Sequence, residues 1–370
     1  MRIDGIELRV VTLPLVSPFV TSFGTQTERT ALLVRAVADG VEGWGECVAL
    51  PEPVYSSEYV VGALDVIERF LGPALLKESD LTAGRVGPVL HSFVGHRIAK
   101  AALEMAILDA QLRSAEQSFA DYLGVTKDRV PSGVSVGIQP SIADLVTAVG
   151  GYLDEGYQRI KIKIKPGWDI EPVKALRAEF GEIPLQVDAN SAYTLDDVAI
   201  FQELDDYGLL LIEQPLYEDD IRLHSVLARM ISTPICLDES IVSARAAADA
   251  IALNAAQIIN IKPGRVGGYL EAMRIHELAY SASIPVWCGG MLETGIARGA
   301  NAALAALPGF TLPGDISGSD RFYREDITEP FVLEDGFIRV PTVPGIARLP
   351  IMDRLEEVTV STRWIGSDPR

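Results

Sequence analysis

Cysteine and histidine are scarce in this sequence, which has three cysteines and four histidines among 370 residues. A low, odd number of cysteines without close spacing excludes a disulfide framework and a zinc-binding pattern. Each cysteine lies in or beside an apolar segment, so we expect buried thiols in a reducing compartment such as the cytoplasm. The histidines show no metal-ligand spacing, and we interpret them as structural.

The sequence also has no excess of positive charge and no long apolar run. The formal charge is -19, from 51 acidic and 32 basic residues, so neither a nucleic acid nor an anionic membrane surface is an expected partner. No apolar run approaches the length of about 18 residues that a membrane helix needs, and the first residues lack a signal-peptide pattern. No Gly-x-Gly-x-x-Gly follows an apolar run, which argues against dinucleotide binding. We expect a cytoplasmic protein, and its acidity does not exclude a small anionic substrate.

Residues 126–320 alternate short apolar runs with segments of helical spacing. Eight such runs recur about every 25 residues, which is typical of the parallel strands of a βα barrel rather than of a Rossmann sheet. The runs are Val134–Ile138, Ile160–Ile164, Leu185–Val187, Leu209–Ile212, Ile235–Leu237, Ile258–Ile261, Pro285–Cys288 and Phe310–Leu312.

Both ends of the chain differ from this central segment. Residues 1–125 begin with strand-like runs, with a hairpin turn at Asp39-Gly40, and continue with helical spacing in residues 56–71 and 97–113. Glu104 and Asp109 lie among apolar residues of the second helix, which favours structural hydrogen bonding over catalysis. Residues 321–370 return to strands and turns, and we expect them to pack on the N-terminal portion.

The 17–27 segment lies between the first two predicted strands and contains Phe19 and Phe23. Its mixture of glycine, proline and aromatic residues suits a mobile loop that makes apolar contacts. An ordinary surface connection would have the same composition. The residues alone leave both interpretations open.

Five polar residues follow successive apolar runs at intervals of 24 or 25 positions: Lys163, Asp188, Glu213, Asp238 and Lys262. The carboxyl ends of all strands in a βα barrel open on one face, where the active sites of that fold lie. The spacing therefore predicts three carboxylates that converge between two lysines.

These residue types suggest a metal-assisted proton transfer. Three carboxylates without a nearby histidine or cysteine favour Mg²⁺, with Mn²⁺ or another divalent ion as alternatives. Lys161, Lys163 and Lys165 alternate with isoleucines, so all three should share one face of a strand. A lysine acts as a base only after it loses its proton, and the charge of Lys161 would lower the pKa of Lys163.

A small carboxylate substrate would become more acidic at its α-carbon in such a pocket, and proton abstraction would give an enediolate. Lys163 and Lys262 would address that carbon from opposite faces. Two bases permit racemisation, whereas one base with a neighbouring cation permits syn elimination. A non-catalytic barrel that binds acidic metabolites is the alternative of another class.

Further polar residues border these positions. Arg265 either helps to keep Lys262 deprotonated through its charge or pairs with Glu239, and the sequence does not decide between these roles. Asn190 and Ser135 are candidates for substrate or supporting hydrogen bonds, with structural capping as an equal alternative.

Several motifs of the chain resemble those of the enolase superfamily, in its muconate-cycloisomerase-like subgroup, and specifically its o-succinylbenzoate synthase / N-acylamino acid racemase branch. The superfamily motifs are Lys161-Ile162-Lys163, Val187-Asp188-Ala189-Asn190, Ile212-Glu213-Gln214-Pro215, Leu237-Asp238-Glu239-Ser240 and Asn260-Ile261-Lys262-Pro263. The branch motifs are Arg159-Ile160-Lys161-Ile162-Lys163 with Pro166-Gly167-Trp168-Asp169, Lys262-Pro263-Gly264-Arg265-Val266-Gly267-Gly268, the stretch 287–295 with Met291, and Leu312-Pro313-Gly314-Asp315-Ile316-Ser317. Dipeptide epimerases of the superfamily carry Asp-x-Asp near the eighth strand, whereas Ser317 holds the second position here.

The resemblance implies a (β/α)7β TIM-like barrel with an α+β capping domain built from both termini. The expected division is a capping domain in residues 1–125, a barrel with the active site in residues 126–320, and a segment 321–370 that returns to the capping domain. The 17–27 segment would be a lid over the substrate. By the same resemblance, Asp188, Glu213 and Asp238 would bind Mg²⁺, Lys163 and Lys262 would form the acid/base pair, and Lys161 and Asn190 would support them.

The activity that the resemblance implies is the o-succinylbenzoate synthase reaction, a syn dehydration of 2-succinyl-6-hydroxy-2,4-cyclohexadiene-1-carboxylate in menaquinone biosynthesis. Lys163 would remove the α-proton and protonate the leaving hydroxyl, and Lys262 would stabilise the anion. Racemisation of N-acyl or N-succinyl amino acids is the alternative main role or an additional one. Enzymes of this branch are commonly homo-oligomers, which we also expect here.

Overall fold

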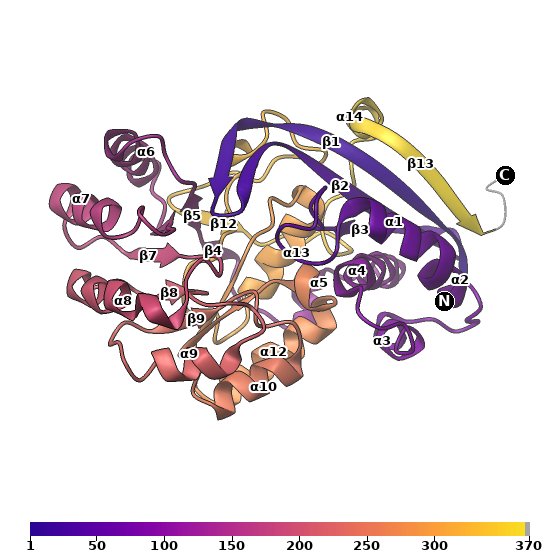
Figure 1. The fold of residues 1–370 in the computed structure, drawn as a ribbon. Coiled ribbons are helices and arrows are strands. Elements are labelled where there is room, and N and C mark those ends of the chain that lie inside the picture. Colours follow the sequence, from indigo (N-terminus) through magenta and orange to yellow (C-terminus); the bar gives the residue numbers. More distant parts are fainter. Residues whose placement is uncertain (367–370) are drawn as a thin grey trace.

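An antiparallel sheet combines both ends of the chain in the computed structural model, which describes residues 1–366. Its strand order is β13-β1-β2-β3, so the last strand pairs with the first, with Gly5 opposite Gly366. Figure 1 shows β13 beside β1 on the side of the molecule away from the parallel strands. The strands are β1 (Ile3–Thr21), β2 (Gly24–Ala38), β3 (Val41–Cys47) and β13 (Thr359–Gly366).

The expected turn between β2 and β3 is confirmed. Ala38 pairs with Val41, and Asp39 and Gly40 have φ angles of 51° and 79°, as a two-residue hairpin turn requires. The expected loop over the 17–27 segment is wrong, because β1 and β2 continue as paired strands to a tight turn between Thr21 and Gly24. The strand register shifts between Pro14 and Phe19, which bends the hairpin. We call residues 17–27 the hairpin tip.

Short helices cover one face of this sheet, and the longest of them, α4, contacts β3. Glu104 and Asp109 of α4 have the structural role that was predicted: the Glu104 carboxylate accepts from the Leu270 N–H, and Asp109 accepts from the Trp44 and Ile346 N–H groups. The helices are α1 (Val60–Val66), α2 (Gly72–Leu75), α3 (Ala83–Val89), α4 (Arg97–Ser114) and α5 (Phe119–Leu123), with a π-helical turn at Ile67–Leu71.

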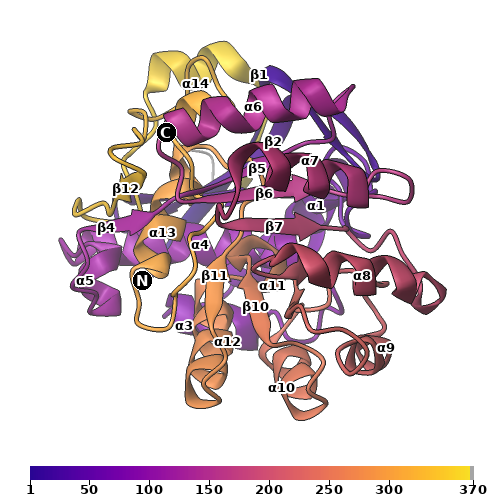
Figure 2. The same cartoon turned by 90° about the vertical axis from the view of Figure 1, so that its left-hand side faces the viewer.

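The second part of the protein is a curled sheet of seven parallel strands in the order β11-β10-β9-β8-β7-β6-β5. Helices α6 to α10 and α12 lie around its outer side (Figure 2). The strands are β5 (Gly133–Val136), β6 (Arg159–Lys163), β7 (Leu185–Asp188), β8 (Ile212–Glu213), β9 (Ile235–Leu237), β10 (Ile258–Ile261) and β11 (Val286–Cys288). The helices are α6 (Ile142–Asp154), α7 (Ile170–Phe180), α8 (Val198–Leu204), α9 (Ile221–Leu227), α10 (Ala244–Ala252), α11 (Pro263–Val266), α12 (Tyr269–Ser281) and α13 (Gly295–Ala305).

Residues 309–316 close this sheet into a barrel without forming a regular strand, so the expected eighth strand at Phe310–Leu312 is wrong in detail. Phe310 bridges Val286 and Gly314 bridges Ser132, each as an isolated pair. Pro313 cannot donate a ladder hydrogen bond, and single bonds replace the ladder: Asp315 N–H donates to Cys288 O at 2.9 Å, and Gly133 N–H donates to Gly314 O at 2.7 Å.

Two smaller expectations also need correction. Lys165 does not share the inward face of Lys161 and Lys163, because β6 ends at Lys163 and Lys165 lies exposed in the following turn. The run Leu209–Ile212 becomes regular strand only at Ile212, after the left-handed Gly208.

Polar caps explain where the barrel helices begin. Ser141 Oγ accepts from Asp144 N–H at the start of α6, and Asp220 Oδ1 accepts from Leu223 N–H at the start of α9. Each such cap satisfies a helix N–H that has no partner within the helix.

The C-terminal segment adds β12 (Phe337–Arg339), which pairs with β4 (Arg129–Pro131), and α14 (Met352–Val358) before β13. The expected turn Glu334-Asp335-Gly336 leads into β12, with Glu334 opposite Phe337. Among residues 1–366, no helix is long and apolar enough to cross a membrane.

Candidate active site

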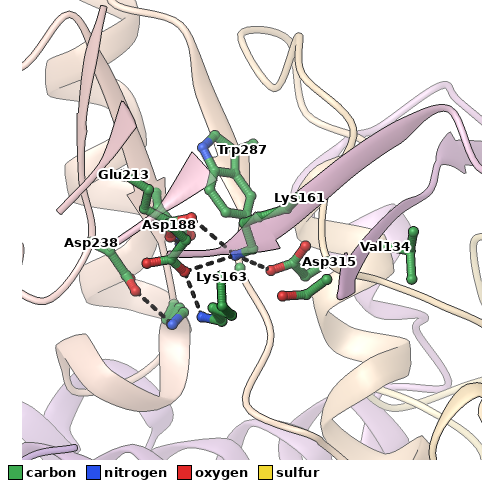
Figure 3. A network of polar contacts seen from close by, with 12 residues as sticks. Val134, Lys161, Lys163, Asp188, Glu213, Asp238, Trp287 and Asp315 are labelled. Carbon is green, nitrogen blue, oxygen red and sulfur yellow. Dashed lines mark hydrogen bonds and ion pairs between the residues drawn. The ribbon is translucent and has the colours of Figure 1, made fainter. Parts of the chain in front are cut away.

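The strand register brings the predicted polar residues to one end of the barrel. Lys163 on β6 lies beside Asp188 on β7, and Asp188 lies beside Glu213 on β8. Asp238 directly follows β9, and Lys262 directly follows β10. All five side chains are buried, and Figure 3 shows Lys163 close to the three carboxylates at this end of the barrel, as the spacing predicted.

Lys161 lies at the centre of the buried charges. Its Nζ atom lies 2.7 Å from Asp315 Oδ2, 3.0 Å from Glu213 Oε2 and 3.4 Å from Asp188 Oδ2. The same atom lies 4.7 Å from the centre of the Trp287 ring, a cation–π contact. Burial opposes the Lys161 charge, but the carboxylates outweigh it and raise its pKa above the ordinary value.

Lys163 and Asn190 form a second group beside this one. Lys163 Nζ donates to Asp188 Oδ2 at 2.6 Å and to Asn190 Oδ1 at 2.8 Å. The Asn190 amide then donates to Glu239 Oε1 at 2.9 Å. Asn190 therefore links Lys163 to Glu239 through two hydrogen bonds.

Lys262 has a different set of partners. Its Nζ atom donates to Asp238 Oδ2 at 2.7 Å and to the Tyr55 hydroxyl at 3.2 Å. Burial opposes the Lys262 charge, but Asp238 and Tyr55 outweigh it and raise the pKa well above its ordinary value.

Arg265 does not pair with Glu239, so that alternative is wrong. Its Nη1 atom contacts the other oxygen of Asp238 and donates to the Tyr55 hydroxyl at 3.2 Å. The Arg265 charge lowers the pKa of Lys262, but the opposite effect of Asp238 and Tyr55 is larger, so the net shift is upward. In this structure Arg265 therefore does not leave Lys262 neutral.

The three carboxylates experience conflicting influences on their charge. Burial, with repulsion from Asp188, raises the pKa of Glu213 to about 8. Burial also disfavours charged Asp188 and Asp238, but lysines lower the pKa of Asp188, and Arg265 with Lys262 lowers that of Asp238. Cations thus already compensate two of the three carboxylates.

This arrangement bears on whether a metal ion fits. Within the described residues, no group of three or more His, Cys, Asp or Glu side chains is arranged to hold a metal ion, because lysines contact the oxygens of Asp188, Glu213 and Asp238. The chemistry of the set still fits a hard divalent cation, since it offers three carboxylates at adjacent strand ends. Such a cation would take over oxygens that now accept from lysine.

A cavity lies over these charges. Lys161, Lys163 and Lys262 face it, and Ser135 contributes a buried hydroxyl with no protein hydrogen-bond partner among the described residues. Its wall therefore combines cations, neutral hydrogen-bonding groups and apolar rings. The remaining lining residues are Phe19, Thr21, Phe23, Gln26, Leu50, Tyr55, Asn190, Gly290, Met291, Leu292, Asp315 and Phe322.

The hairpin tip forms the outer wall of this cavity. The Phe19 ring contacts the Phe322 ring edge-on at 6.2 Å between centroids, and Phe23 lies 6.2 Å from Tyr55. The tip is attached to the barrel where Ile138 N–H donates to Val20 O at 2.9 Å. Phe19 and Phe23 thus lie at the cavity, as the lid interpretation requires.

The structure places the predicted site residues in two groups. Those that line the cavity are Lys161, Lys163, Lys262, Asn190, Ser135, Phe19, Phe23 and Met291; those that lie behind it are Asp188, Glu213, Asp238, Glu239 and Arg265.

Sequence reasoning did not assign three further residues to the site: Tyr55, Trp287 and Asp315. Asp315 comes shortly after the eighth apolar run, so its place in the repeated pattern could have identified it. Tyr55 lies between β3 and α1, where no periodic pattern points to the barrel.

Comparison with known proteins agrees with this geometry. Residues 5–124 match the mandelate racemase / muconate lactonizing enzyme N-terminal domain, and residues 144–348 match the enolase C-terminal domain-like family. An N-succinylamino acid racemase from Amycolatopsis sp is 62% identical over 99% of this chain and 100% of its own. The o-succinylbenzoate synthase of Bacillus subtilis is 47% identical over 94% of each chain.

Solved structures extend the likeness to three dimensions. A member of the enolase superfamily from Listeria innocua superposes with a TM-score of 0.95 at 38% identity, over 100% of both chains. Members of this superfamily generally use Mg²⁺. The chain therefore belongs to the enolase superfamily, a family of enzymes, in the group that includes o-succinylbenzoate synthases and N-succinylamino acid racemases.

Proposed function

We propose that this protein removes the α-proton of a small carboxylate substrate and can return it to either face of the α-carbon. The observation that carries this proposal is the placement of two lysines in one cavity. Lys163 ends β6 and Lys262 follows β10, with three strands between them. A substrate in the cavity would have one amine on each side of its α-carbon.

The chain's own residues would divide the work. One lysine takes the proton as a base while the other lies on the opposite face as an ammonium group and donates a proton there. Asn190 holds Lys163 in place, and Tyr55 and Asp238 hold Lys262. Apolar residues of the hairpin tip exclude water, which strengthens each charge interaction within the cavity.

Asp188, Glu213 and Asp238 are the residues that would hold a divalent cation, and Mg²⁺ is our proposal for its identity. When bound, such a cation supplies electrostatic stabilisation of the charge that develops on the substrate carboxylate.

Two reactions fit this site, and we propose that the protein performs both. Racemisation of N-succinyl amino acids is favoured by the two opposed lysines and by the relative from Amycolatopsis sp. Dehydration of 2-succinyl-6-hydroxy-2,4-cyclohexadiene-1-carboxylate, in menaquinone biosynthesis, is favoured by the relative from Bacillus subtilis. That reaction requires only one base, for which we propose Lys163, with Lys262 as the stabilising cation.

One experiment tests the proposal. The protein is incubated with an N-succinyl amino acid in D₂O with Mg²⁺, and separately with the cyclohexadiene acid. We expect deuterium at the α-carbon with loss of optical activity in the first sample, and o-succinylbenzoate in the second. Absence of both reactions would favour a non-catalytic barrel that binds acidic metabolites, and would refute the enzymatic proposal.

Two further properties are part of the proposal. A cytoplasmic location is supported by three cysteines that are buried and unpaired. A homo-oligomer is proposed from the family alone, and size-exclusion chromatography with light scattering tests it.

A further inference from the structure

Asp315 is a carboxylate whose side chain is only 11% exposed, and the proposed reaction assigns no role to it. It lies in the irregular segment that closes the barrel, and its N–H donates to Cys288 O at 2.9 Å. Arg159 Nη2 donates to Asp315 Oδ1 at 2.8 Å. The backbone and Arg159 thus fix this side chain, and its second oxygen remains available at the cavity wall.

That second oxygen is the nearest anionic partner of Lys161. The separation from Lys161 Nζ is 2.7 Å, against 3.0 Å for Glu213 and 3.4 Å for Asp188. Figure 3 shows Lys161 between Asp315 on one side and Asp188 with Glu213 on the other. Lys161 is therefore shared between two of the proposed metal ligands and one carboxylate outside that set.

A divalent cation on Asp188 and Glu213 would compete with Lys161 for their oxygens. Without Asp315, those two carboxylates would be the only anionic partners within 4.0 Å of Lys161 among the described residues. An isolated buried ammonium group is unfavourable, so Lys161 would then hold the metal ligands strongly. With Asp315 in place, Lys161 can release them and still remain paired.

We propose that Asp315 is a positioning residue that retains Lys161 when a divalent cation binds, and so makes Asp188 and Glu213 available to the cation. This inference rests on the proposed function, because it assumes that these carboxylates bind a metal. It also gives Trp287 a role, since its ring contacts Lys161 and Arg159 at 4.7 and 5.1 Å and keeps both cations beside Asp315.

The test is the affinity of the substrate-free protein for Mg²⁺ and Mn²⁺, measured by isothermal titration calorimetry. Asp315→Asn keeps the shape and an oxygen that accepts from Arg159, but it removes the charge. We expect affinity to fall by about tenfold, the scale typical of residues that support a metal site. Asp326→Asn is the control: Asp326 is a buried aspartate that accepts from Gly295 N–H and Ser319 Oγ–H, so affinity should not change.

A second pair of variants separates this role from a simple loss of negative charge. In a Lys161→Met background, Asp315→Asn should change metal affinity by less than about twofold, because the two residues act as one unit. The double variant also removes both partners of a buried ion pair, which proteins tolerate better than the loss of one. If Asp315→Asn alone does not fold, the metal affinity of the double variant can still be compared with that of Lys161→Met.

Three results would overturn the inference. The first is an unchanged metal affinity in folded Asp315→Asn. The second is an equal tenfold loss in both backgrounds, which would mean that Asp315 affects the metal through its charge and not through Lys161. In these two cases the wild-type protein still binds metal, so the proposed function stands. A wild-type protein that binds neither ion overturns both the inference and the metal site of the proposed function.

Discussion

Replacement of Lys262 by methionine tests the two-base arrangement most directly. Methionine approximates the length of lysine, and Asp238 keeps Arg265 as a partner. The substitution therefore does not leave a buried carboxylate unpaired, which would cost about 3–5 kcal/mol. We expect Lys262→Met to fold, with its defect confined to proton transfer.

The magnitude follows from the role of the lost group. A positioned acid or base contributes about 10²–10⁴-fold to a rate, which corresponds to about 3–5 kcal/mol in the activation free energy. Racemisation of an N-succinyl amino acid should fall by that factor. Lys163 remains, so exchange of the α-proton should persist, at a reduced rate, for only one enantiomer.

The assay incubates each enantiomer separately in D₂O with Mg²⁺, and follows α-deuteration by NMR and inversion by chiral chromatography. Lys163→Met should show the opposite preference and exchange only the other enantiomer. Lys165→Met is the control, since Lys165 is exposed beyond the end of β6, and it should racemise normally. The reasoning is refuted if Lys262→Met racemises at the wild-type rate or if both variants exchange the same enantiomer.

Three other perturbations have defined outcomes. A Cβ at Gly137 would lie 2.8 Å from Val20 O, so Gly137→Ala should displace the hairpin tip and raise KM in steady-state kinetics. Gly151→Ala is the control: a Cβ there would contact nothing within 4 Å, and KM should not change. Burial raises the pKa of Glu104 to about 7, so the free energy of unfolding should fall as pH rises from about 4.5 to 7. Glu104→Gln should reduce the slope of this free energy against pH by up to about 1.4 kcal/mol per pH unit in denaturant titrations. An unchanged slope would contradict this prediction. Chelation by EDTA should abolish α-proton exchange, and added Mg²⁺ should restore it. The circular dichroism spectrum should be retained in EDTA, because lysines pair with the carboxylates when the metal is removed. Exchange that persists in EDTA would contradict a metal role.

The barrel was predictable because its sequence signal is local and repeated. Each strand is buried on both faces and reads as a short apolar run, and each crossover helix adds a nearly constant number of residues. The same regularity placed Asp188, Glu213 and Asp238 at successive strand ends. The eighth strand was not predictable in detail, because the pattern shows apolar residues at 310–312 but not that single hydrogen bonds around Pro313 close the sheet.

The hairpin tip was misread for a different reason. Glycine, proline and serine in the 17–27 segment are typical of loops, but pairing between β1 and β2 overrides this local preference. Tyr55 escaped notice because its contact with Lys262 joins residues that lie 207 positions apart in the sequence.

The sequence by itself thus determined the barrel, the order of the polar residues around its mouth, and the family to which they belong, because strand period and βα length are properties of neighbouring residues. Only the tertiary structure decided how the charges pair: Lys161 with Asp315 as well as Glu213, Arg265 with Asp238 rather than Glu239, and Tyr55 with Lys262. The physical reason is that ion pairs depend on distances of a few ångströms between side chains on different elements, and spacing along the chain does not specify such distances.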